Sequence, residues 1–109
     1  MRNGHVVKWI FWYFINRVDR MVRIEVNYKG RVQGVGFRCQ VCNISKNFNC
    51  TGYVKNLLDG SVEFLAEGEL KEVELFIETV DSKLKGYWSH KTEDKRLGLP
   101  HFQDFSIRF

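Results

Sequence analysis

The sequence has few cysteines, no long apolar run and little excess charge beyond its first twenty residues, and each shortage excludes a class of protein. Its 109 residues include three cysteines, an odd number, whereas the disulfide framework of a small secreted domain needs pairs. The most apolar stretch, residues 6–15, contains Lys8 and is too short to span a bilayer as a helix. It also lacks a small-residue cleavage site, which disfavours a secretory signal. We therefore expect reduced thiols and a cytoplasmic protein.

A metal site is disfavoured because the cysteines and histidines do not form a complete set of ligands. The spacing Cys39-x-x-Cys42 suits zinc ligands, and His90 and His101 follow later in the chain. Both cysteines fall on a predicted helix, however, and no second paired motif completes a tetrahedral ligand set. We expect no metal and no cofactor, and we interpret the cysteines as small packing residues.

The net charge of +4 is concentrated at the N-terminus. Residues 1–20 contain four basic residues and one acidic residue, while the remaining 89 residues contain 13 basic and 12 acidic ones. A domain with a net charge of +1 lacks the basic surface on which nucleic-acid binding depends. We therefore expect no nucleic-acid partner.

Residues 1–20 are interpreted as an N-terminal extension, and the length favours a single domain at residues 21–109. Three interpretations of the extension remain open: a tail that binds a membrane surface or a partner, an additional strand, or an extended translation start ahead of Met21. We favour the last. For the domain itself we expect a monomer with no membrane association.

Apolar periodicity predicts the secondary structure of the domain. Alternation with period two predicts strands over residues 23–28, 61–68 and 105–109. A short segment rich in β-forming residues predicts another over residues 50–56, and residues 87–94 are interpreted as a further strand. Apolar stripes with helical spacing predict helices at residues 37–48 and 69–84. Asp59-Gly60 is a hairpin turn signal, and residues 95–101 are expected to form a loop. The first six of these elements follow the order β-α-β-β-α-β, which predicts an α+β, ferredoxin-like sandwich: an antiparallel sheet with two helices on one face.

A glycine-rich loop connects the first predicted strand to the first helix. Gly30, Gly34 and Gly36 permit positive φ, so the loop can turn several backbone N–H groups inward and form a cup for an anion. Arg38 falls in the first helical turn, where its guanidinium can bind two phosphate oxygens at once. The loop fits neither a Walker motif nor a dinucleotide-binding motif. The residues alone also allow a tight connection with a solvated surface arginine.

Three short motifs together resemble the acylphosphatase family. They are "GRVQGVGFR" at residues 30–38, "GYVKN" at residues 52–56 and "DGSVE" at residues 59–63, and the likeness extends over about residues 22–109. The resemblance implies a metal-independent hydrolase that cleaves the carboxyl-phosphate anhydride bond of small acyl phosphates such as acetyl or carbamoyl phosphate. It implies that Arg38 binds the substrate phosphate and that Asn56 positions the attacking water. The implied phosphate-binding loop comprises Arg31, Val32, Gln33, Gly34, Val35, Gly36 and Phe37.

Two other classes remain as alternatives to the enzyme. An RNA-binding module shares the β-α-β-β-α-β order, but residues 61–68 lack the aromatic pattern that such a module carries on its third strand. A noncatalytic domain could use the same cup to sense an anion, although the presence of both Arg38 and Asn56 favours catalysis.

Overall fold

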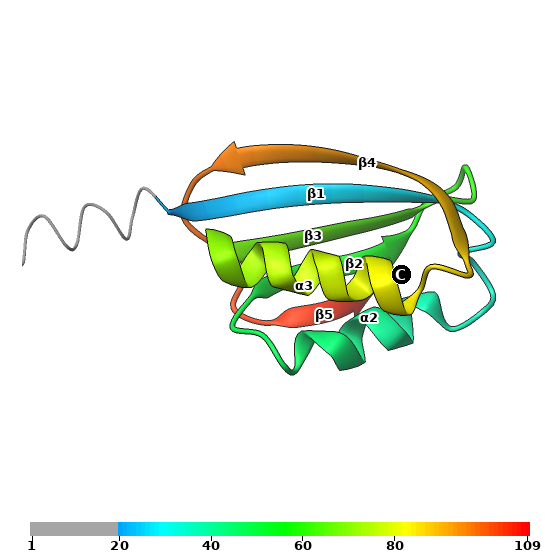
Figure 1. The fold of residues 1–109 in the computed structure, drawn as a ribbon, viewed down its shortest axis with the longest axis horizontal. Helices are drawn as coiled ribbons and strands as arrows, with labels where there is room; N and C mark the ends of the chain where they lie inside the picture. Colours follow the sequence, from blue (N-terminus) through cyan, green and yellow to red (C-terminus); the bar gives the residue numbers. More distant parts are fainter. Residues whose placement is uncertain (1–19) are drawn as a thin grey trace, which may run out of the picture.

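The computed structural model describes residues 20–109, which form a five-stranded sheet with two helices packed on one face (Figure 1). In sequence order the elements are β1 Met21–Gly30, α2 Phe37–Ser45, β2 Thr51–Asn56, β3 Val62–Glu69, α3 Leu70–Lys83, β4 Trp88–Leu97 and β5 Phe105–Arg108. In space the strands follow the order β4-β1-β3-β2-β5. The predicted α+β, ferredoxin-like architecture is confirmed.

The core lies between the sheet and the helices because alternate strand residues face the helical layer. On β1 the inward side chains are Val22, Ile24, Val26 and Tyr28, each at most 3% exposed. The apolar stripes of the helices complete the core with Phe37, Val41, Ile44, Val73, Phe76, Ile77 and Val80. The opposite face of the sheet has no helix over it in the described part of the chain.

The sheet is mixed, so the expectation of a wholly antiparallel sheet was wrong at one edge. β1 pairs with β3 and β4, and β2 pairs with β3, all antiparallel. β5 runs parallel to β2, with Gly52 opposite Phe105 and Lys55 opposite Arg108. Strand periodicity identifies β5 but carries no information about its direction, which depends on the route that the preceding loop takes.

Two predicted boundaries were also wrong. β4 continues to Leu97, three residues into the predicted loop, because pairing with β1 continues as far as Val22 opposite Leu97. α2 ends at Ser45, and Phe48 reaches the core from the turn that follows. Its ring stacks on Phe76 with centroids 5.5 Å apart, so a core position that fits the helical period lies outside the helix.

The predicted N-terminal extension lies outside the described residues except for Arg20, and its three interpretations stay open. Among residues 20–109, no helix is long and apolar enough to cross a membrane.

Candidate active site

The glycine-rich loop reaches α2 through two residues in the left-handed region of φ. Gly34 has a φ of +77° and Gly36 a φ of +78°, conformations that residues with a Cβ rarely adopt. Gly36 is the N-cap of α2, and no side chain caps the helix start by a hydrogen bond. The first N–H groups of a helix have no partners within the helix. The loop therefore leads into a helix start whose geometry favours an anion.

A pocket of about 190 Å³ lies at this helix start. Its lining comes from the loop, from the first turn of α2 and from the ends of β2 and β5; the residues are Val32, Gly34, Gly36, Phe37, Arg38, Cys39, Asn56, Ile107 and Phe109. Arg38 and Asn56, which are 18 positions apart in the sequence, thus line one pocket. The two side chains on which the sequence prediction depended can act on one bound molecule.

Arg38 is held by the last residues of the chain. Its Nη1 donates a hydrogen bond to the backbone oxygen of Arg108 at 3.0 Å, and its guanidinium carbon lies 4.8 Å from the centroid of the Phe109 ring. The hydrogen bond to Arg108 uses one N–H, and the Phe109 ring covers one face of the planar guanidinium. The guanidinium has five N–H donors in total. Donors therefore remain for a ligand in the pocket.

Asn56 is the last residue of β2, and its side-chain oxygen is buried. Within the described residues, Asn56 Oδ1 is a buried side-chain oxygen that accepts no hydrogen bond. A buried acceptor left without a partner costs about 1–3 kcal/mol. Such an atom at a pocket wall suits a small ligand with a hydrogen to donate, and water is the simplest one.

The seven predicted loop residues differ in their placement. Val32, Gly34, Gly36 and Phe37 line the pocket, and Val32 and Phe37 are each 1% exposed. Arg31, Gln33 and Val35 are not part of the lining. The backbone N–H of Arg31 donates to the Tyr87 carbonyl at 2.8 Å, so it serves to anchor the loop.

Three pocket residues were missed from the sequence. Ile107 and Phe109 reach the pocket only because β5 runs parallel to β2, and no local pattern encodes that pairing. Cys39 was interpreted as a packing residue, yet it is exposed and lines the pocket. Its position next to Arg38 at the helix start was the available signal.

Comparison with known proteins decides the family. The family model described as Acylphosphatase matches residues 24–107. The chain belongs to the acylphosphatase family. This family assignment was predicted from the three motifs and is confirmed.

Related acylphosphatases cover most of the described chain. The acylphosphatase of Syntrophotalea carbinolica is 36% identical over 93 residues, covering 81% of this chain and 97% of the relative. That of Methanospirillum hungatei is 44% identical over 66 residues, covering 61% of this chain and 72% of the relative. The crystal structure of the Bacillus subtilis acylphosphatase superposes with a TM-score of 0.72 at 31% identity, covering 81% of this chain and 99% of that one.

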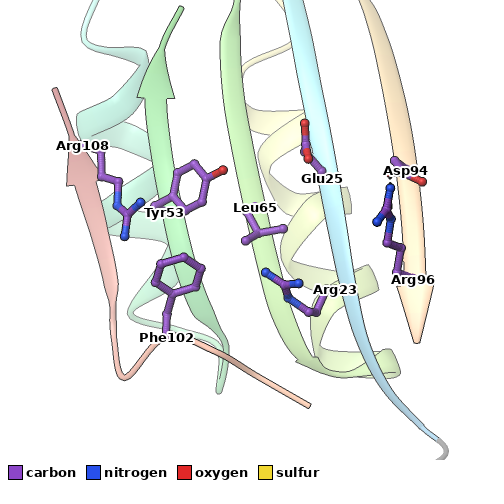
Figure 2. Close-up of a pocket in the computed structure, with 8 residues that line it drawn as sticks. All are labelled: Arg23, Glu25, Tyr53, Leu65, Asp94, Arg96, Phe102 and Arg108. Atoms are coloured by element: carbon purple, nitrogen blue, oxygen red, sulfur yellow. Dashed lines mark hydrogen bonds and ion pairs between the residues drawn. The ribbon is translucent and has the colours of Figure 1, made fainter. Parts of the chain in front are cut away.

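The open face of this acylphosphatase sheet carries a separate pocket of about 280 Å³ (Figure 2). The guanidinium carbon of Arg108 lies there 4.7 Å from the ring centroids of both Tyr53 and Phe102, and these two rings meet edge to face with centroids 5.4 Å apart. Arg108 thus takes part in both regions: its side chain lines this pocket, and its backbone oxygen accepts the hydrogen bond from Arg38.

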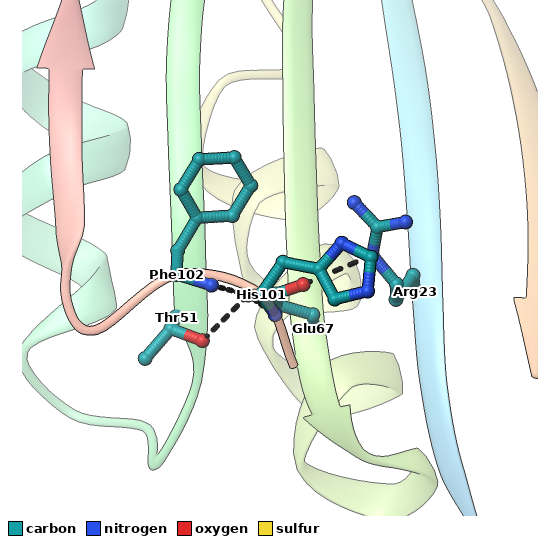
Figure 3. Close-up of polar contacts among 5 residues, drawn as sticks. All are labelled: Arg23, Thr51, Glu67, His101 and Phe102. Carbon is teal, nitrogen blue, oxygen red and sulfur yellow. Dashed lines mark hydrogen bonds and ion pairs between the residues drawn. The ribbon is translucent and has the colours of Figure 1, made fainter. Parts of the chain in front are cut away.

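The loop between β4 and β5 is fastened to the open face by one buried carboxylate. Glu67, which is 0% exposed, accepts hydrogen bonds from Arg23 Nε, from Thr51 Oγ1 and from the backbone N–H groups of His101 and Phe102 (Figure 3). Burial by itself raises the pKa of Glu67, but the four donors outweigh it and lower the pKa below the ordinary glutamate value. The carboxylate thus stays ionised and sets the start of the path that leads to β5.

Proposed function

We propose that Arg38, Asn56 and the glycine-rich loop hydrolyse small acyl phosphates in the pocket that they share. Membership of the acylphosphatase family makes the chain a hydrolase of acyl phosphates. The observation that carries the residue assignment is the joint presence of Arg38 and Asn56 in one pocket at the start of α2. The loop backbone, Arg38 and the helix start bind the phosphate group, with no metal or cofactor.

Charge explains how the pocket binds its substrate. A phosphate group carries negative charge on several oxygens, and Arg38 offers paired N–H donors to two of them. The backbone N–H groups at the start of α2 add donors whose dipole favours an anion. These donors also oppose the charge that the phosphoryl oxygens carry in the transition state, which is the main catalytic task in phosphoryl transfer.

The leaving group needs no acid. An acyl phosphate releases a carboxylate, whose conjugate acid has a pKa near 4, so it departs as an anion at neutral pH. The amide of Asn56 is not a base, but its buried Oδ1 can accept a hydrogen bond from a water and hold that water in line with the phosphorus. The proton of the water is taken up by oxygens of the substrate phosphate.

Two substitutions separate binding from turnover. We expect Arg38→Ala to lower kcat/KM by about a thousandfold or more and to weaken competitive inhibition by inorganic phosphate, because the guanidinium binds the phosphate in both states. We expect Asn56→Ala to lower kcat by about 10²–10³-fold while the inhibition constant of phosphate changes by less than about threefold. Steady-state hydrolysis of acetyl phosphate with EDTA present measures both.

Matched substitutions control for general effects on the fold. Arg96 has an exposed side chain on β4, and Asn43 is exposed on α2, so Arg96→Ala and Asn43→Ala should keep wild-type kinetics. Wild-type kcat in Asn56→Ala, or unchanged phosphate inhibition in Arg38→Ala, would contradict the assigned roles.

We also propose that the protein acts as a cytoplasmic monomer. The odd number of cysteines, three, does not suit a disulfide framework and supports a reducing compartment. Sedimentation equilibrium tests the monomer directly, and a mass near 12.9 kDa is expected.

A further inference from the structure

Gln33 lies within the phosphate-binding loop, but its side chain is directed away from the phosphate pocket and toward the β2–β3 hairpin. The half-buried amide donates both of its hydrogens through Nε2, to the Leu57 carbonyl at 2.7 Å and to the Ser61 carbonyl at 2.9 Å. These two acceptors lie 24 and 28 positions later in the sequence. One side chain thus fastens the loop to a different part of the fold.

The hairpin that receives Gln33 is itself closed by hydrogen bonds. The Leu57 N–H donates to the Ser61 carbonyl at 2.9 Å, and the Gly60 N–H donates to the Leu57 carbonyl at 3.2 Å. Asp59 accepts the backbone N–H of Ser61 at 2.9 Å, and the Ser61 hydroxyl accepts from Asn27 on β1 at 3.0 Å. The two carbonyls are therefore fixed points rather than groups on a free loop.

The loop has anchors of its own that do not involve Gln33. At its first residue, the Arg31 N–H donates to the Tyr87 carbonyl at 2.8 Å. At its end, the Gln40 N–H donates to the Gly36 carbonyl at 3.1 Å and begins α2. In between, Val32 is 1% exposed and belongs to the core. These contacts hold the loop at both ends and at Val32 independently of Gln33.

The hydrogen bonds of Gln33 reach the chain directly beside Asn56. Asn56 ends β2, and the next residue, Leu57, carries one of the two carbonyls that Gln33 holds. The phosphate donors belong to the loop and α2, whereas the amide that holds the water belongs to β2. In-line attack depends on the distance between these two segments, and a misplacement of about 1 Å can cost about a hundredfold in rate.

We infer that Gln33 is a positioning residue that sets the phosphate cup and Asn56 at the distance needed for in-line attack. The inference rests on the proposed function of the pocket and adds a role that the loop motif does not state. Gln33 contributes no contact to the substrate through its side chain. Its effect passes through the Leu57 and Ser61 carbonyls to Asn56.

The test replaces the amide and follows binding and turnover separately. Gln33→Met keeps the length of the side chain and removes both donors, and Gln33→Glu keeps its shape and sets a carboxylate against two carbonyl oxygens. For both variants we expect kcat for acetyl phosphate to fall by about 10–100-fold, with the inhibition constant of phosphate within about threefold of wild type. Gln103→Met, at an exposed position in the β4–β5 loop, is the matched control and should keep the wild-type kcat.

A double substitution separates positioning from a general effect on the fold. If Gln33 acts through Asn56, then adding Gln33→Met to Asn56→Ala should leave kcat within about twofold of Asn56→Ala alone, because residues that act as a unit are not additive. Wild-type kcat in both single variants would overturn the inference. A parallel loss of phosphate affinity, or independent losses in the double variant, would also overturn it by showing that Gln33 shapes the cup instead.

The inference can fail separately from the proposed function. If the wild-type chain hydrolysed no acyl phosphate, the proposed function would fail, but the geometry could still be measured in crystals soaked with inorganic phosphate. In Gln33→Met we expect phosphate in the cup and a longer distance from phosphorus to Asn56 than in the wild type. An unchanged distance would overturn the positioning role.

Discussion

At the level of single residues, the pocket combines two side chains of different chemistry. Arg38 supplies a forked set of donors, and Asn56 supplies a buried acceptor with no other partner among the described residues. Both were predicted as site residues because the motifs that contain them resemble those of the acylphosphatase family. The bonds of Gln33 could not be predicted in the same way, because their acceptors are backbone carbonyls that any residue could provide.

Gly52, the first residue of the motif that ends in Asn56, should tolerate no side chain. Its φ is +139°, and a Cβ built there would lie 1.9 Å from the carbonyl oxygen of Leu65 on β3. Gly52→Ala must therefore separate β2 from β3 or distort the backbone, and we expect it to lower the free energy of unfolding by at least about 2 kcal/mol. The midpoint of urea denaturation measures the change.

Gly86 provides the matched control for that substitution. A Cβ there meets nothing within 4 Å, and its φ lies outside the region that favours glycine. Gly86→Ala should change the free energy of unfolding by no more than about 1 kcal/mol and can raise it. Equal midpoints for the two variants would contradict the close approach of β2 and β3.

At the level of helices and strands, sequence patterns predicted the type of each element more accurately than its boundaries. The helical stripe of α2 was right in type, but Phe48 fits the stripe and lies beyond the helix, because a core position can be filled from a turn. β4 is longer than predicted. Most of its residues are exposed and polar, so its sequence shows no clear alternation, and its length is set by pairing with β1. Edges that depend on a neighbouring strand are not encoded locally.

The stability of the loop between β4 and β5 should depend on the negative charge of Glu67. Glu67→Gln keeps the shape but removes the negative charge that faces Arg23 and the N–H groups of His101 and Phe102. Removing one charge of an ion pair leaves the other charge without compensation, which destabilises the fold. We expect a lower unfolding temperature and faster amide hydrogen exchange at residues 101 and 102. Glu78→Gln, at an exposed position on α3, should change neither quantity.

The same carboxylate gives the loop a pH dependence. Because the pKa of folded Glu67 is lowered, its bonds contribute stability that is present above the ordinary pKa of 4.5 and is lost as the pH falls toward the lower folded value. The wild-type unfolding temperature should therefore fall more steeply below pH 4.5 than that of Glu67→Gln. Parallel pH profiles for the two proteins would contradict this contribution.

At the scale of the whole molecule, the fold brings together three segments that the sequence keeps apart. The order of strands and helices was predictable from periodicity, and the loop and β2 motifs predicted two walls of the pocket. Ile107 and Phe109 form the third wall. They reach the pocket because β5 pairs in parallel with β2, a strand about 50 positions earlier in the sequence. Long-range pairing of this kind is a property of the assembled sheet, so no stretch of residues could have predicted it.

We propose that the pocket holds the phosphate group and directs a water at its phosphorus. Hydrolysis of acetyl phosphate by the wild-type protein in water labelled with ¹⁸O, followed by mass spectrometry of both products, is the decisive test. In-line attack on phosphorus predicts that the enzyme-dependent reaction places the label in inorganic phosphate and leaves acetate unlabelled. Label in the acetate would mean that water attacks the carbonyl carbon, and it would contradict the roles proposed for Arg38 and Asn56.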